Sequence, residues 1–170
     1  NEVVGAEALV RWPQPEGQPP IGPGEFIPLA EELGLMDRIA NQVFEQACHQ
    51  LRSWQRRPGN EGFRVSVNIA PVQLGNPNLA DELVAITRAV GVSPASVALE
   101  ITESALEQSF DKISDVIDRL VAAGFPLALD DFGKGHSSLG RLIELPFSVL
   151  KIDRSFVAQT PDGRGAAVVA

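Results

Sequence analysis

Strand-like and helix-like segments alternate along almost the whole chain. Short apolar runs of strand length recur at five places, which are 5–12, 65–70, 97–102, 127–131 and 149–153. Between them, apolar residues recur every three or four positions, which predicts helices at 25–33, 39–54, 79–90 and 113–121 and a short one near 138–143. Strands that alternate with helices are typical of parallel βα units, so we predict an α/β fold with a parallel sheet.

The length and the charge of the chain limit what it can be. Its 170 residues suit a single domain but are few for a complete α/β barrel, which typically needs about 250 residues. The formal charge of −8 and the pI of about 4.7 argue against binding to a nucleic acid polymer and against direct contact of this segment with an anionic membrane. A small anionic substrate would therefore need a bound cation between itself and the protein.

One cysteine, Cys48, is present, so no internal disulfide can form. A reducing, cytoplasmic location is the expectation, and a longer parent protein could still be anchored in a membrane through another region. Cys48 lies in a helical, mostly apolar stretch, and we expect it to be an inert core residue. No apolar run reaches the roughly 18 residues that a membrane span needs.

Polar residues interrupt the predicted strands at or near their carboxyl ends. They come in pairs, which are Glu7 with Arg11, Ser66 with Asn68, Glu100 with Thr102, Asp130 with Asp131, and Lys151 with Asp153. Members of a pair that are two residues apart share one face of a strand. The neighbouring apolar residues on these strands are expected to pack under the helices, and they are Val65, Val67, Ile69, Leu99, Ile101, Leu150 and Ile152.

Several carboxylates that meet at one end of a sheet need positive charge nearby, because an isolated buried carboxylate is costly. One lysine and one arginine are too few for this set, and a divalent cation resolves the conflict. The candidate ligands are all oxygen donors, namely Glu7, Asn68, Glu100, Asp130 and Asp131, and such a set favours Mg²⁺ or Mn²⁺ over zinc. The two adjacent aspartates allow two ions, and two ions about 4 Å apart are the usual arrangement for cleaving a phosphodiester.

Five segments stand out in order along the chain, namely GAEALVRW at 5–12, VSVNIAPVQL at 65–74, LEITES at 99–104, LDDFGKGHSSL at 129–139, and LPF at 145–147 followed by LKID at 150–153. In this order they resemble the motifs of the EAL family of cyclic-di-GMP phosphodiesterases. The resemblance implies a TIM-like (βα)8 barrel of the EAL type with an atypical first strand. It also implies metal-dependent hydrolysis of cyclic di-GMP to linear pGpG.

By this resemblance each matching residue has an implied role. Glu7, Asn68, Glu100 and Asp130 would hold the first metal, and Asp130 with Asp131 would face the second. Lys151 would orient the attacking water or the phosphate, so Lys151, Asp131 and Glu7 are the implied catalytic residues. The implied substrate contacts are Arg11, which would meet a phosphate, Leu9 and Asn68. Glu103 would steady the loop that follows Asp131.

The sequence also departs from the family pattern. Lys134 and His136 stand where a small residue or threonine and a tyrosine are expected. We expect residues 1–170 to be a single EAL domain cut at both ends, an incomplete barrel without its first strand and its last two strands. A catalytic acid and two substrate glutamines would then be missing, so this piece alone is expected to be inactive and poorly folded, whereas the intact parent is active. The resemblance further implies a GGDEF or sensory domain upstream and pairing of two copies near the Asp131 segment.

Other interpretations remain open at this point. Glu7 alone would pass for a surface charge, Asn68 for a turn residue, Glu103 for a helix-start carboxylate and Lys151 for a partner of Asp153. A degenerate EAL domain could act as a cyclic-di-GMP receptor or scaffold without catalysis, although every ligand position covered here is filled. A glycoside hydrolase is disfavoured by the adjacent aspartate pair and by the few aromatic residues (6%, with no tyrosine).

Overall fold

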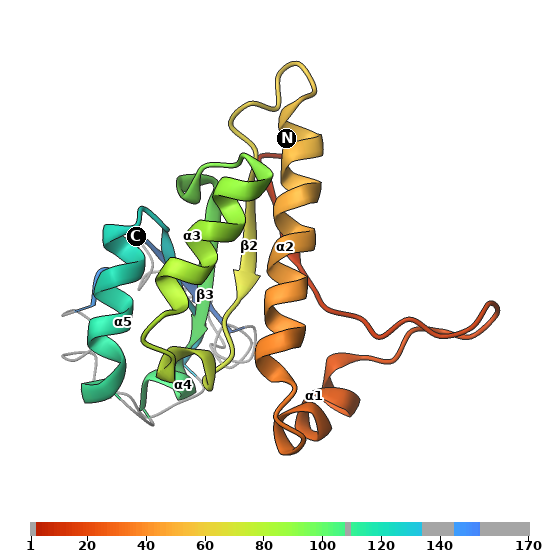
Figure 1. The fold of residues 1–170 in the computed structure, drawn as a ribbon, viewed down its shortest axis with the longest axis horizontal. Coiled ribbons are helices and arrows are strands. Elements are labelled where there is room, and N and C mark those ends of the chain that lie inside the picture. The colour runs from red at the N-terminus through yellow and green to blue at the C-terminus, as the bar shows by residue number, and fades with distance from the viewer. Residues whose placement is uncertain (1–2, 108–109, 134–144, 154–170) are drawn as a thin grey trace, which may run out of the picture.

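The computed structural model describes residues 3–107, 110–133 and 145–153 of the chain. Within these ranges, five parallel strands form one sheet in the order β1-β2-β3-β4-β5 (Figure 1). The strands are β1 (Gly5–Ala8), β2 (Arg64–Asn68), β3 (Val97–Thr102), β4 (Leu127–Phe132) and β5 (Val149–Ile152). The predicted α/β class is confirmed, and the sheet is an open part of a barrel whose strands lie next to one another in chain order.

The helices and short 3₁₀ turns lie between the strands in the chain. They are α1 (Pro23–Glu32), α2 (Met36–Gln55), η1 (Gln73–Gly75), α3 (Leu79–Val90), η2 (Pro94–Ser96), α4 (Glu103–Glu107) and α5 (Phe110–Ala122). Figure 1 shows α2, α3 and α5 side by side along one face of the sheet, with α4 at one end of the sheet. In the described part of the chain, no helix is long and apolar enough to cross a membrane.

A hydrophobic core fills the space between the sheet and these helices. On β3, Leu99 and Ile101 are fully buried in this core, and Thr102 is more accessible. Val65, Val67 and Ile69 are buried in the same core, as predicted. Cys48 on α2 is also fully buried, so its predicted core position is confirmed. Leu150 departs from the prediction because it is 44% exposed on β5, an edge strand of the described sheet.

The segment after β1 folds differently from the predicted strand at 5–12. Regular pairing ends at Ala8, and Trp12 instead forms an isolated antiparallel bridge with Ile21. This bridge closes the proline-rich hairpin that projects from the body of the molecule in Figure 1. The Trp12 ring meets Phe26 of α1 edge-to-face at 5.8 Å, which fixes the base of the hairpin.

Most of the predicted boundaries lie within a few residues of the observed ones. Pro23 lies two residues before the predicted helix at 25–33 and opens α1, where its missing N–H is not needed for a helical hydrogen bond. The five-residue helix α4 was not predicted, because it is too short to show an apolar period. The predicted helix at 138–143 lies outside the described residues.

Candidate active site

The carboxyl ends of the parallel strands lie level with one another. Glu7 on β1 is in register with Ser66, Asn68 on β2 with Glu100, and Thr102 on β3 with Asp130. Because neighbouring parallel strands run in the same direction, this register brings their terminal polar side chains to one rim of the sheet. That rim is where α/β barrels keep their active sites.

The ammonium of Lys151 on β5 lies among three carboxylates of this rim. Its Nζ is 2.7 Å from Oε2 of Glu100, 3.2 Å from Oε2 of Glu7 and 3.6 Å from Oδ1 of Asp130. The Nδ2 of Asn68 donates a 3.1 Å hydrogen bond to Oε1 of Glu7. The structure therefore brings together five predicted site residues from five different strands, and we call Glu7, Asn68, Glu100, Asp130 and Lys151 the rim cluster.

Burial and charge act in opposite directions on these groups. Burial raises the pKa of Glu100, whose side chain is only 2% exposed, and the contact with Lys151 offsets this only in part. Burial also acts to raise the pKa of Glu7, but the hydrogen bonds from Asn68 and Lys151 and the charge of Lys151 outweigh it and lower that pKa. Burial acts to lower the pKa of Lys151, whereas the contacts with Glu100, Glu7 and Asp130 raise it overall. The lysine is thus held in its charged form by the acids around it.

Asp131 sits at an irregularity of β4. The pairing register between β4 and β5 shifts between Leu129 and Phe132, and Asp131 has a φ of 58°, a left-handed value that is uncommon for a residue other than glycine. In a regular strand, Asp130 and Asp131 would point to opposite faces of the sheet. A bulge re-aims a side chain and breaks this alternation, so the usual rule does not apply to Asp131.

Glu103 is buried where β3 passes into α4, with 3% of its surface exposed. Its Oε2 accepts a 3.0 Å hydrogen bond from the backbone N–H of Gly133, the residue that follows β4. Glu103 is the first residue of α4 and also binds the backbone just after Asp131. Its interpretations as a helix-start carboxylate and as a residue that steadies the loop are therefore compatible.

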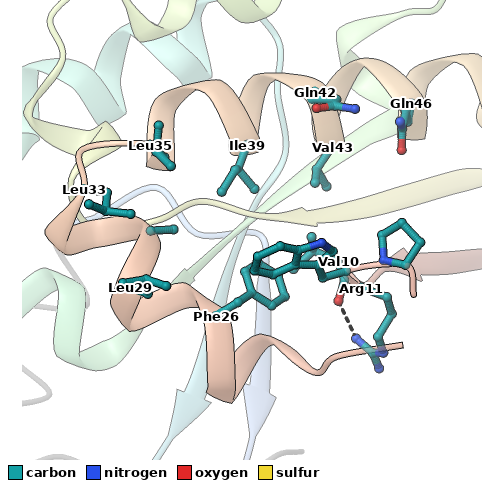
Figure 2. A pocket seen from close by; sticks show the side chains of 13 residues that line it. Val10, Arg11, Phe26, Leu29, Leu33, Leu35, Ile39, Gln42, Val43 and Gln46 are labelled. Carbon is teal, nitrogen blue, oxygen red and sulfur yellow. Dashed lines mark hydrogen bonds between the residues drawn. The ribbon is translucent and has the colours of Figure 1, made fainter. Parts of the chain in front are cut away.

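A cavity of about 410 Å³ adjoins the rim cluster. Glu7, Leu9, Arg11 and Asn68 line it together with residues of α1 and α2. The Arg11 guanidinium is exposed and donates a 2.7 Å hydrogen bond to the carbonyl of Val10 (Figure 2). The three predicted substrate contacts thus share one cavity beside Glu7, and Arg11 is held by its own backbone rather than by the carboxylates.

A larger and mainly apolar pocket of about 560 Å³ lies between α1, α2 and the segment 10–13 (Figure 2). Arg11 is the one predicted site residue that lines it. Leu29, Leu33 and Leu35 contribute exposed apolar surface to this pocket. This pocket was not predicted from the sequence. The sequence feature that could have indicated it is the group of leucines at the end of a helical apolar pattern. The carboxylates Glu7, Glu100 and Asp130 lie at the rim cluster and do not line this pocket.

The rim cluster has the chemistry of a site for a hard divalent cation. Its donors are carboxylate and amide oxygens, and the acids already surround one positive charge, the Lys151 ammonium. Among the residues that the structure describes, no three acidic, histidine or cysteine side chains form a cluster with metal-binding geometry. The residues of the rim cluster fit such an ion through the chemistry of their carboxylate and amide oxygens.

In the described part of the chain, five parallel strands with helices on one face and an acidic rim at the strand ends define a protein of the α/β-barrel class. The chain belongs to the EAL domain family, whose model matches residues 1–170. The recognition of this family from its motifs is confirmed.

Similar proteins are found among curated sequences and solved structures. The chain is 41% identical over 161 residues to the cyclic di-GMP phosphodiesterase NbdA of Pseudomonas aeruginosa, covering 95% of this chain and 20% of that protein. It is 37% identical over 168 residues to MucR of the same organism, named a bifunctional diguanylate cyclase/cyclic di-GMP phosphodiesterase, covering 98% of this chain and 24% of MucR. A solved structure of the MucR phosphodiesterase in complex with c-di-GMP matches with a TM-score of 0.86 and 37% identity, covering 98% of this chain and 67% of that one. The chain thus spans about a fifth to a quarter of these curated relatives.

Proposed function

We propose that this domain is a metal-dependent phosphodiesterase that hydrolyses cyclic di-GMP to linear pGpG. The observation that carries the proposal is the convergence of Glu7, Glu100 and Asp130 around one positive charge at the strand ends. The relatives named as cyclic di-GMP phosphodiesterases support the choice of substrate, because they are up to 41% identical to this chain and the solved MucR phosphodiesterase shares its fold. The filled ligand positions favour an enzyme over a receptor or scaffold.

The metal-holding residues in this proposal are those that the motifs imply. Glu7, Asn68, Glu100 and Asp130 would hold a first Mg²⁺ or Mn²⁺ ion, and Asp131 with Asp130 would hold a second. When bound, such ions polarise the phosphodiester and make a nearby water more acidic. The bulge at Asp131 supports the second role, because it frees this carboxylate from the regular alternation of the strand.

The remaining roles belong to groups that bind and orient. Lys151 carries three N–H donors and, once its carboxylate partners hold a metal, can orient the attacking water or a phosphate oxygen. Arg11 is exposed in the cavity beside Glu7 and can bind the second phosphate of the substrate, with Leu9 and Asn68 lining the same space. Glu103 holds the backbone of Gly133 and so positions the end of β4.

The wider setting is also a proposal. The bifunctional name of MucR and the small share of each relative that this chain covers support a parent protein with a cyclase-like GGDEF or sensory domain upstream. Cyclic di-GMP hydrolysis would take place in the cytoplasm, and two copies would pair near the Asp131 segment. Residues 1–170 alone would be inactive, because both edge strands of the described sheet, β1 and β5, lack a neighbour on one side.

The test is hydrolysis by the intact gene product that carries residues 1–170. We expect it to convert cyclic di-GMP to pGpG in the presence of Mg²⁺ or Mn²⁺, with the product measured by chromatography. The reaction should stop when a chelator is added. Glu7→Ala should lower the rate by several orders of magnitude, whereas Glu45→Ala, which removes an exposed acid from α2, should leave it unchanged. Binding of the dinucleotide without turnover under these conditions would favour the receptor interpretation instead.

A further inference from the structure

Gln73 is a buried polar residue close to the rim of the sheet, and neither the rim cluster nor the implied substrate contacts include it. It lies shortly after Asn68 in the chain, at the start of η1, and is only 3% exposed. Its backbone N–H donates to the carbonyl of Ala70 at 2.9 Å, and the N–H of Ala70 donates to Oε1 of Gln73 at 3.0 Å. These two bonds hold the Gln73 side chain in one orientation.

The bond to Ala70 also decides which way the amide group of Gln73 faces. A backbone N–H needs an acceptor, so the atom that meets it must be Oε1, and the N–H₂ group is directed elsewhere. Among the residues that the structure describes, Nε2 has no hydrogen-bond partner. It is not sealed in the core either, because Oδ1 of Asn41 is the one fully enclosed side-chain atom without a partner in that part of the chain. Two N–H donors of a buried side chain are therefore available to a ligand.

The open space beside Gln73 is the cavity of about 410 Å³ that adjoins Glu7. Much of its wall is apolar and comes from α1 and α2, including Ile27, Met36 and Ile39. A mainly apolar cavity with a few polar groups in fixed positions is typical of a site for a small organic ligand. A flat heterocyclic base suits this wall better than a phosphate, which needs positive charge around it.

We propose that Gln73 is a further substrate-binding residue, whose amide N–H₂ donates to O6 of a guanine base of cyclic di-GMP in this cavity. This inference rests on the proposed function, because it takes the cavity beside Glu7 to be where the substrate binds. Guanine has an acceptor at O6, whereas adenine has an N–H₂ donor at the same position. Two donors that face each other form no hydrogen bond, so Gln73 favours guanine over adenine.

The test measures how tightly the intact gene product binds cyclic di-GMP and its adenine analogue, cyclic di-AMP. Calorimetry in chelator gives both dissociation constants without hydrolysis. The two dinucleotides carry the same phosphates and riboses, so the ratio of their dissociation constants reports on the bases alone. Gln73→Glu keeps an oxygen for the N–H of Ala70 but replaces the two donors by an acceptor. We expect this variant to lower the preference of the wild type for cyclic di-GMP by about tenfold or more.

The matched control is Gln42→Glu, which adds the same charge. Gln42 is exposed on α2 and lines the neighbouring apolar pocket instead of this cavity (Figure 2). The ratio should change less than twofold in this control. Gln73→Met is a second variant of similar length that adds no charge, and the ratio should fall several-fold there as well, whether or not Gln73→Glu folds.

A purely structural role of Gln73 would weaken the binding of both dinucleotides together and leave their ratio unchanged. An unchanged ratio in the Gln73 variants, or a wild type without preference for cyclic di-GMP, would therefore overturn this inference even if the protein hydrolyses cyclic di-GMP. Conversely, a protein that binds cyclic di-GMP without turnover and loses its preference in Gln73→Glu would overturn the phosphodiesterase proposal alone. A wild type that does not bind cyclic di-GMP would overturn both.

Discussion

Oε2 of Glu103 accepts a hydrogen bond of 3.0 Å from the backbone N–H of Gly133, thirty residues further along the chain. Glu103 follows β3 directly and Gly133 follows β4 directly, so this bond ties together the ends of two strands that carry rim-cluster residues. Gly133 has a φ of 99°, a conformation that favours glycine, and the buried carboxylate meets its N–H at that turn.

Removing this acceptor should loosen the end of β4. We expect Glu103→Ala to lower the free energy of unfolding by about 1.5–3 kcal/mol, the usual range for a hydrogen bond to a charged group. Hydrogen exchange at the Gly133 amide should accelerate by tenfold or more. Glu103→Gln keeps an acceptor oxygen and is the control, so a Gln variant that exchanges as fast as the Ala variant would contradict this role.

Gly5 lies two residues before Glu7, where β1 approaches β2 closely. A Cβ added at Gly5 would lie 2.9 Å from the carbonyl oxygen of Arg64, a backbone atom that can move only with its strand. We expect Gly5→Ala to cost about 1–3 kcal/mol of stability, as overpacking does, and to lower activity by displacing Glu7. Gly24→Ala is the control, since a Cβ there has no neighbour within 4 Å and alanine favours helix α1. Thermal denaturation of both variants checks this, and equal midpoints would refute it.

The left-handed backbone of Asp131 makes a prediction about stability that is separate from catalysis. Asp131→Gly and Asp131→Ala remove the same carboxylate, but only glycine adopts a φ of 58° without strain. We expect the glycine variant to be about 1 kcal/mol more stable by urea denaturation. At Asp81, in the first turn of α3, the order should reverse, because alanine is the better helix former. An Asp131→Ala variant that is as stable as Asp131→Gly would mean that Asp131 carries no backbone strain.

The Cys48 thiol should be inert at ordinary pH. Burial, with the charge of Glu45, raises its pKa to about 12. The fraction of the reactive thiolate becomes substantial only as the pH approaches that value. At pH 8, roughly one molecule in ten thousand carries the thiolate. We expect no reaction of the native protein with Ellman's reagent at pH 8 over an hour and complete reaction in denaturant. Rapid labelling of the native protein would show that α2 opens readily.

The regular elements were largely predictable from the sequence, and the contacts of the site were not. β3 and α3 match their predicted bounds, because alternation and apolar period are local properties that a short window contains. The grouping of Glu7, Asn68, Glu100 and Asp130 at one rim followed from parallel strands having equivalent ends. The bulge at Asp131 could not be predicted from the sequence, because it depends on how β4 pairs with β5.

The sequence predicted the rim at which Lys151 lies but not the residues that its ammonium contacts. Its place at a strand end predicted the correct rim, and Asp153, two residues away, offered a local partner for its charge. The structure places the ammonium against acids from three other strands instead. Which acids the ammonium contacts depends on how closely segments far apart in the sequence approach one another. The order of residues along one strand does not contain this information. The exposure of Leu150 has the same origin, because a strand's neighbours decide how much of it is covered.

The bond between Lys151 and Glu7 joins residues 144 positions apart, which lie on the first and last strands of the described sheet. During synthesis, β1 to β4 leave the ribosome before the lysine does, so the acids spend that interval without their counter-charge. Closing so long a loop is slow compared with forming the local βα units. The acidic rim therefore assembles late in folding. An intact rim requires that the polypeptide has been synthesised and folded as far as β5.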